Sequence, residues 1–252
     1  LNTCTNVVAK ITRKYADDGY SDFKLPKITI LIHTSTSFNC IDERLEEEAS
    51  TFYDGHSPNR NTVWAVGQSR ASKRGIIYNT AANQLFDGGE EALTGIYAKD
   101  NANAWATTGG GNLLVTTNSG LNWDKTDFTG TTGYFNGIGF FNENNGIAVG
   151  DPVNNQFGVI LTTNGGKNWA KTSSIASQID EAGLVGTLSI FGDRAYFGTN
   201  AGRIIRGRAF GKSCTASQVE RGSSMWCIAF HSKTSCISIY PNRLNHGSDV
   251  LK

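Results

Sequence analysis

Residues 158–169, GVILTTNGGKNW, repeat residues 112–123, NLLVTTNSGLNW, without a gap. A weaker copy occupies residues 75–86. Self-similarity at a fixed period marks an array of supersecondary units, each of which buries its apolar faces against its neighbours. The repeat therefore indicates a fold that is built from several similar units.

A second shared piece precedes each copy and recurs every 40 to 50 residues, at 64–67, 104–107, 147–150 and 195–198. Earlier still, alternating apolar residues such as Phe135, Ile138 and Phe140 predict another strand. Each unit reads as three strands joined by turns, with a fourth strand after the tryptophan, as at 124–128. Four antiparallel strands per repeat are typical of a β-propeller blade.

We therefore expect an all-β fold, a single β-propeller domain over residues 1–252, with five to seven blades and six as the central estimate. The fifth unit is expected to begin at residue 226, and the run 27–33 to supply a further blade or close the ring. Residues 41–53 place apolar and acidic side chains on opposite helical faces, which predicts a short inserted helix.

Composition agrees with many short strands and polar turns, with 29 Gly, 4 Pro and 10% aromatic residues. A net charge of +1 provides no global field for nucleic acid, so no nucleic-acid partner is expected. No stretch approaches the roughly 20 apolar residues that span a bilayer, so no membrane span is expected. No apolar signal region stands at the N-terminus, and the chain is expected to be soluble and already processed.

Neither a metal site nor a cofactor is expected from the motifs. The five cysteines form no Cys-x-x-Cys pair, and the four histidines are scattered. No Gly-x-Ser-x-Gly elbow is present either, so no catalytic residue is assigned. Disulfides that join Cys4 to Cys40, or Cys227 to Cys236, stay open because spacing does not define connectivity.

The repeated turns resemble the Asp-box of sialidase-type and related propellers, Ser/Thr-x-Asp-x-Gly-x-Thr-Trp, with Asn in place of Asp. In this pattern the Asx side chain bonds the backbone of a hairpin turn, Gly supplies a positive φ and Trp packs between blades. These are structural roles and imply no catalysis. The matching positions are Thr116, Asn118, Gly120 and Trp123, and Thr162, Asn164, Gly166 and Trp169.

Residues 135–169, FNGIGFFNENNGIAVGDPVNNQFGVILTTNGGKNW, resemble the propeller family of photosystem II stability and assembly factors and its bacterial homologues. Residues 184–206 fit the next blade of that family, whereas the motif expected after Gly207 is missing. The resemblance implies a non-enzymatic assembly factor, scaffold or accessory subunit outside the cytoplasm (periplasmic, thylakoid-lumenal or extracellular). Its partner would be a protein, such as a membrane or multisubunit complex.

Two alternatives stay open beside this reading. One is a glycoside hydrolase or sialidase-like enzyme, which needs carboxylic acids that converge at the propeller mouth. The other is a carbohydrate-binding propeller, which the many Asn and aromatic residues would suit. The candidate acids, Asp100, Glu143, Asp151 and Asp193, stand beside turns and are interpreted as solvated turn residues.

Basic residues provide the candidate binding site. One group lies in the loop of the first clear unit, and the other lies on the matching strand of a later unit. If both faced one side of the disc, they would suit an acidic protein partner, because arginine offers paired donors to carboxylates. The two groups are Arg70, Lys73 and Arg74, and Arg203, Arg206 and Arg208.

Overall fold

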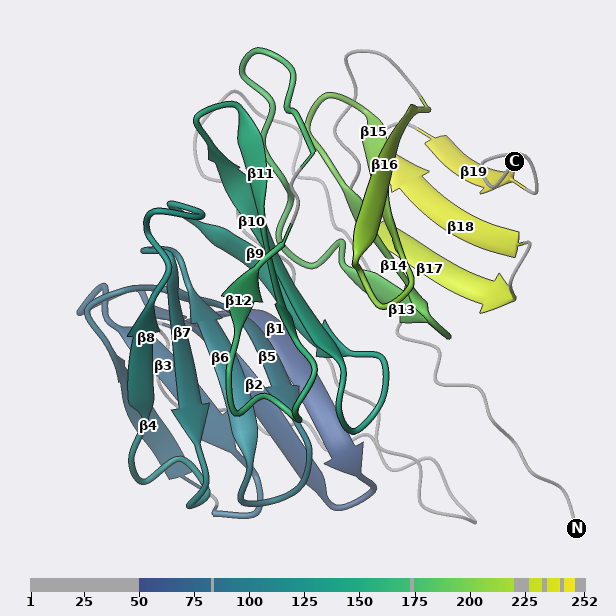
Figure 1. Cartoon of the computed structure of the whole chain (residues 1–252). Helices are drawn as coiled ribbons and strands as arrows, with labels where there is room; N and C mark the ends of the chain where they lie inside the picture. The colour runs from purple at the N-terminus through teal and green to yellow at the C-terminus, as the bar shows by residue number, and fades with distance from the viewer. Residues whose placement is uncertain are drawn as a thin grey trace, which may run out of the picture.

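The computed structural model of the chain describes residues 50–82, 84–172 and 175–219, and the backbone of three later strands within 227–247. All regular structure in these residues is β-strand (Figure 1). The strands form antiparallel sheets in which each strand pairs with the next one along the chain. The predicted all-β fold with four-stranded blades is confirmed.

Each sheet is one blade, numbered here from I to V in chain order. Blade I contains β1 (Ser50–Asn59), β2 (Thr62–Ser69), β3 (Gly75–Asn79) and β4 (Gln84–Gly89). Blade II contains β5 (Leu93–Ala98), β6 (Ala104–Thr108), β7 (Asn112–Thr116) and β8 (Asp124–Asp127). Blade III contains β9 (Phe135–Phe140), β10 (Gly146–Val153), β11 (Gln156–Thr162) and β12 (Ala170–Lys171).

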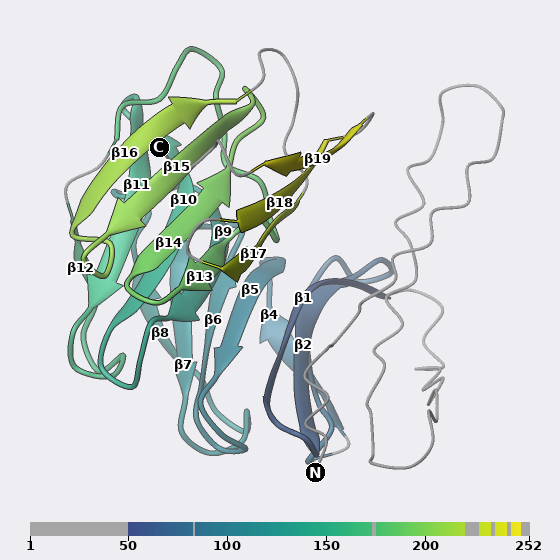
Figure 2. The same cartoon turned by 90° about the vertical axis from the view of Figure 1, so that its right-hand side faces the viewer.

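The two remaining blades follow the same meander. Blade IV contains β13 (Ser189–Phe191), β14 (Arg194–Gly198), β15 (Arg203–Arg208) and β16 (Ser213–Gln218). Blade V contains β17 (Cys227–Ser232), β18 (Ser235–Tyr240) and β19 (Arg243–Gly247) in the described residues. Figure 2 shows the sheets as successive layers, with β17 beside β13 and β14.

Stacking buries both faces of the inner sheets. Every residue of β3 and of β6 is buried, although neighbouring residues of a strand point to opposite faces. A surface sheet would alternate apolar and polar residues, whereas a sheet covered on both sides stays apolar throughout. This burial explains the continuous apolar runs of the sequence.

Blades I and II are joined by hydrogen bonds between residues 42 positions apart. Ile96 N donates to Asp54 Oδ2 at 2.9 Å, and Ala98 N donates to His56 Nδ1 at 3.2 Å. Burial raises the pKa of Asp54 to about 6 from its ordinary 3.8, although the hydrogen bonds from Ile96 and Gly55 lower it. Burial also lowers the pKa of His56, which leaves Nδ1 as an acceptor at neutral pH.

Blades II and III meet at a glycine. Trp105 on β6 donates from Nε1 to Gly166 O at 3.1 Å, and Trp169 donates to the same oxygen at 3.2 Å. Gly166 has a φ of 79°, and an added Cβ would lie 2.4 Å from Trp105 Nε1. The indole of one blade therefore occupies the space that a side chain at this turn would fill.

The predicted strand after Trp123 is confirmed as β8. β2 and β10 extend to Ser69 and Val153, which leaves short connections to β3 and β11. Blade IV keeps four strands although its sequence lacks the repeated motif after Gly207. There the turn uses Gly211, whose φ is 81° and whose added Cβ would lie 3.0 Å from Ile147.

The helix predicted at 41–53 is wrong for its last four residues, which begin β1. Thr51 and Phe52 pair with Gln68 and Gly67 on β2, where an added Cβ on Gly67 would lie 1.9 Å from Thr51 O. Tertiary pairing with this glycine overrides the local helical pattern. Residues 41–49 and the run 27–33 lie outside the described residues, and the described sheets number five.

The register of blade V separates one candidate pair of cysteines. Cys227 pairs with Ile239, and Cys236 pairs with Phe230, on antiparallel strands. Three residue steps along a strand span about 10 Å, which exceeds the Cα separation of a disulfide. Cys4 and Cys40 lie outside the described residues.

We predict that Gly166→Ala lowers the free energy of unfolding by about 2–4 kcal/mol, from the strained positive φ and the clash with Trp105. Urea unfolding followed by tryptophan fluorescence measures this loss. The control is Gly133→Ala, because nothing lies within 4 Å of a Cβ added there. Equal stability of the two variants would contradict the proposed contact between blades.

We also predict that Asp54 makes stability depend on pH. The native state holds the Asp54 proton at pH values where the unfolded chain has lost it, so its contribution disappears as pH rises from about 4 through 6. The difference between 3.8 and about 6 corresponds to about 3 kcal/mol. Wild type should lose that amount relative to Asp54→Asn between about pH 3 and pH 8 in urea unfolding. A difference that does not change with pH would refute the burial of this carboxylate.

Candidate protein-binding face

Blade IV carries a cluster of cations on one side of its sheet. Neighbouring residues of β15 point to opposite faces, so Arg206 and Arg208 share one face and Arg203 and Ile205 share the other. Ile205 packs into the core formed with blade III. Arg206 and Arg208 therefore lie on the face that is turned away from blade III.

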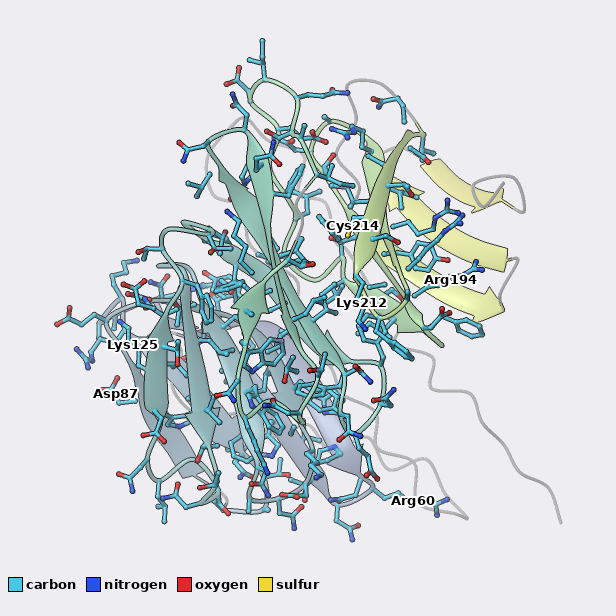
Figure 3. All side chains as sticks on the ribbon, viewed as in Figure 1. Arg60, Asp87, Lys125, Arg194, Lys212 and Cys214 are labelled. Carbon is cyan, nitrogen blue, oxygen red and sulfur yellow. The ribbon has the colours of Figure 1, made fainter. Side chains whose placement is uncertain are left out.

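Two more cations belong to this face or its lower rim. Arg194 begins β14, beside the pair formed by Ala195 and Gly207. Lys212 lies in the turn before β16, and Phe210 N of that turn donates to Asp193 O at 2.9 Å, which joins the two turns. Figure 3 shows Arg194 and Lys212 at the same end of blade IV. We call Arg194, Arg206, Arg208 and Lys212 the basic face.

The charges of the basic face act on one another. Burial lowers the pKa of Arg206 most, and repulsion from Arg208 and Arg194 lowers it further, while Tyr196 raises it. Arg206 Nε is buried and has no hydrogen-bond partner within the described part of the chain. Tyr196 lies directly opposite Arg206 on β14. No carboxylate of the described residues forms an ion pair with the Arg206 guanidinium.

Counter-charges near the basic face are sparse. Asp193 approaches Arg194 at 4.0 Å, and both side chains are substantially exposed, so this pair contributes little. Blade V is the neighbouring sheet, because β17 contacts β13 and β14. Its sequence from 227 to 247 contains no Asp or Glu. Among the described residues, Asp193 is therefore the only acid that pairs with a member of the face.

Arg203, on the opposite face of β15, has a structural role. Its Nη1 forms an ion pair with Glu181 Oε2 at 2.5 Å, and the Glu181 side chain is 0% exposed. Glu181 also accepts hydrogen bonds from Thr199 Oγ1 at 2.7 Å and Gln178 N at 2.8 Å. This network anchors the segment that enters blade IV, so the guanidinium of Arg203 is committed to the fold.

The first predicted basic group lies in blade I, in the turn between β2 and β3. Arg74 pairs with Asp87 at 2.7 Å, and Arg70 Nε donates to Thr51 Oγ1 at 3.0 Å. Lys73 has a φ of 60° and is exposed. Blades II and III separate this turn from β15 in the chain order of the sheets. Among the six predicted residues, Arg206 and Arg208 share one face of β15, Arg203 lies on its other face, and the remaining three lie on blade I.

The two repeated turns have the same hydrogen bonds. Thr116 Oγ1 accepts from Gly120 N at 3.1 Å, and Asn118 Oδ1 accepts from Asn122 N at 3.0 Å. Trp123 Nε1 donates to Gly120 O at 3.1 Å. The corresponding distances in the second turn, formed by Thr162, Asn164, Gly166 and Trp169, are 2.9, 3.0 and 3.2 Å.

Two of the acids considered for catalysis, Asp100 and Asp151, accept hydrogen bonds from backbone groups. Asp100 Oδ1 accepts from Ala102 N and Asn103 N, both at 2.8 Å. Asp151 Oδ1 accepts from Gly183 N at 2.9 Å and from Asn136 Nδ2 at 2.8 Å. These carboxylates stabilise a turn and the connection into blade IV.

The described residues contain no group of three His, Cys, Asp or Glu side chains suited to a metal ion. The same residues contain no helix long and apolar enough to cross a membrane.

Arg194 and Lys212 are members of the basic face that the sequence did not indicate. Arg194 follows a Gly-Asp turn, and Lys212 follows the irregular turn at 209–211, which replaces the repeated motif. The pairing of β14 with β15 brings Arg194 near Arg208, whereas Lys212 lies in the hairpin that joins Arg208 to β16. The detectable signal was the alternation of Arg206 and Arg208 along one strand, which predicts a common face.

No protein-family model matches the chain, and no curated protein matches its sequence. Among solved structures, the Cps50 (Swd1) β-propeller domain of Myceliophteria thermophila is 10% identical, with a TM-score of 0.52 over 77% of this chain and 64% of that one. U3-55K is 8% identical, with a TM-score of 0.53 over 74% and 62% of the two chains. The structure of YCF48 bound to D1 peptide is 12% identical, with a TM-score of 0.41 over 81% and 83%.

The chain spans a little under two thirds of the length of the first two propellers. Their similarity defines the class of this protein, which is a β-propeller. Identities this low show the fold alone, and the TM-score of 0.41 adds no argument beyond it.

We predict that Arg203→Met lowers the free energy of unfolding by about 3 kcal/mol, because it leaves the buried Glu181 carboxylate without its cation. Arg208→Met, at an exposed residue of the same strand, should change stability by about 0.5 kcal/mol or less. Chemical unfolding of both variants checks the contrast. Comparable losses would mean that Arg208 is also committed to the fold.

Proposed function

We propose that this protein is a non-enzymatic binding propeller that holds an acidic protein partner on the basic face of blade IV. The observation that supports it best is the like-charged cluster of Arg194, Arg206 and Arg208, which the register of β14 and β15 places on one face of blade IV. Among the described residues only Asp193 pairs with this cluster, and a carboxylate-bearing partner would neutralise the remaining charge.

The finer identity is part of the same proposal. The Thr-x-Asn-x-Gly-x-Asn-Trp turns are degenerate Asp-boxes, and their hydrogen bonds from Thr116 and Asn118 support a turn-forming role. Together with the resemblance of residues 135–169, they favour an assembly factor, scaffold or accessory subunit of a multisubunit or membrane complex. By the same resemblance, we propose that it acts outside the cytoplasm.

The contacts of the candidate acids favour binding over hydrolysis. A glycosidase needs one carboxylic acid and one carboxylate that face a common bond. Asp100 and Asp151 instead accept backbone hydrogen bonds in different blades. A carbohydrate-binding propeller is a second outcome that the experiment below distinguishes.

The test is affinity capture of partners from an extract of the source cells by the native chain and by two charge-reversed variants. Arg208→Glu/Lys212→Glu removes exposed cations of the basic face, and Arg70→Glu/Lys73→Glu makes the same change in charge on blade I. We expect the first variant to lose a defined protein partner by at least about tenfold, and the second to retain it.

Native binding should also weaken as ionic strength rises, because the contact depends on exposed charge. Equal retention by both variants would overturn the basic face as the site. A chain that captures no protein but binds glycans on an array would overturn the protein-binding proposal in favour of the carbohydrate-binding one.

A further inference from the structure

Among the described residues, the outer strand of blade IV has an unprotected edge. β16 is the last strand of its sheet, and residues 213–218 read SCTASQ, without charge or proline. Ser213, Thr215 and Ser217 are exposed. No described residue outside the sheet forms a backbone hydrogen bond with Cys214 or Ala216. Proteins usually protect such edges with charges, proline or very short strands, because an open edge pairs with another chain.

The neighbouring blades show that protection. In blade II, Asp124, Lys125 and Asp127 make the edge strand β8 charged, and all its residues are exposed. In blade III the edge strand β12 has only two residues, one of which is Lys171. The open edge of β16 therefore distinguishes blade IV from blades II and III.

The backbone groups that face outward can be identified from the register. Val219 N donates to Gly202 O at 3.0 Å, and these residues continue the pairing of Gln218 with Arg203. Hydrogen-bonded and non-hydrogen-bonded pairs alternate along an antiparallel ladder. Cys214 and Ala216 consequently direct their N–H and C=O groups away from β15, toward the open side.

The arginine side chains beside the open edge of β16 favour an acidic strand there. Thr215 lies directly opposite Arg206, and Ser213 lies directly opposite Arg208. A strand added to β16 would place its alternate side chains on the same face as these arginines, across short hydroxyl side chains. Carboxylates at those positions would reach the guanidinium groups, whereas basic side chains would be repelled.

We propose that β16 accepts an extended acidic segment of the partner protein as a fifth strand of blade IV. Backbone groups of Cys214 and Ala216 would supply its hydrogen bonds, and Arg206 and Arg208 would select acidic residues at every second position. The inference rests on the proposed function, since it specifies how the partner occupies the basic face.

Two synthetic peptides serve as probes. The first is Thr-Glu-Val-Glu-Val-Glu-Val-Thr, and the second has the same sequence with a methyl group on every second backbone nitrogen, along the edge that would face β16. Fluorescence anisotropy with the full chain measures both. Because methylation removes the donors but keeps the charges, we expect the methylated peptide to bind at least about tenfold more weakly. Equal binding of the two peptides would overturn the strand pairing.

The protein variants provide an independent arm. Ala216→Pro removes an outward N–H without breaking the ladder to β15, and should weaken the unmodified peptide at least about tenfold. Lys125→Pro makes the matching change on β8 and should leave binding unchanged. Unaltered binding by Ala216→Pro, with a native unfolding transition, would also overturn the proposal.

Together, the peptide and variant experiments distinguish the strand pairing from the proposed function. If Arg208→Glu/Lys212→Glu abolishes binding but methylation has no effect, the proposed function stands and the strand pairing fails. If methylation matters but charge reversal does not, the strand pairing stands and the acidic specificity fails. A concentration-dependent dimer that Ala216→Pro abolishes would show that a second copy of the chain occupies β16, which contradicts the acidic occupant.

Discussion

The close approach of Trp105 to Gly166 shows the constraint on which this molecule depends. A four-stranded sheet of this size has two apolar faces and cannot cover either by itself. The indole of Trp105 in blade II therefore occupies the space where a Cβ would stand at Gly166 in blade III. Both Trp105 and Trp169 donate hydrogen bonds to the carbonyl of Gly166. Blades that are consecutive in the sequence therefore pack against each other, because each blade completes the core of its neighbour.

Blade IV shows what the same stacking does to charged residues. One face of β15 packs against blade III through Ile205, so Arg203 on that face is held by the buried Glu181. The other face is not part of that core, and there Arg206 meets Arg208 and Arg194 with little compensation. Two arginines three positions apart on one strand thus have opposite roles, one in stability and one in the proposed binding.

Local signals predicted the repeated parts of the fold well. The Thr-x-Asn-x-Gly pattern specifies its own turn, because the Thr116 hydroxyl and the Asn118 amide bond the backbone within four residues. The strand after Trp123 follows from that turn. The helix expected up to residue 53 failed at its end, since the pairing of Thr51 and Phe52 with β2 is a contact between strands that local periodicity cannot express.

The sequence by itself determined the blade as the repeating unit, the positions of its turns and the alternation that places Arg206 and Arg208 together. These features depend on residues close in the chain and on the two-residue period of a strand. Tertiary structure decided which face of each strand is covered, which arginine meets Glu181 and which edge stays open at β16. Those outcomes depend on groups that become neighbours only after the sheets stack, so no local pattern encodes them.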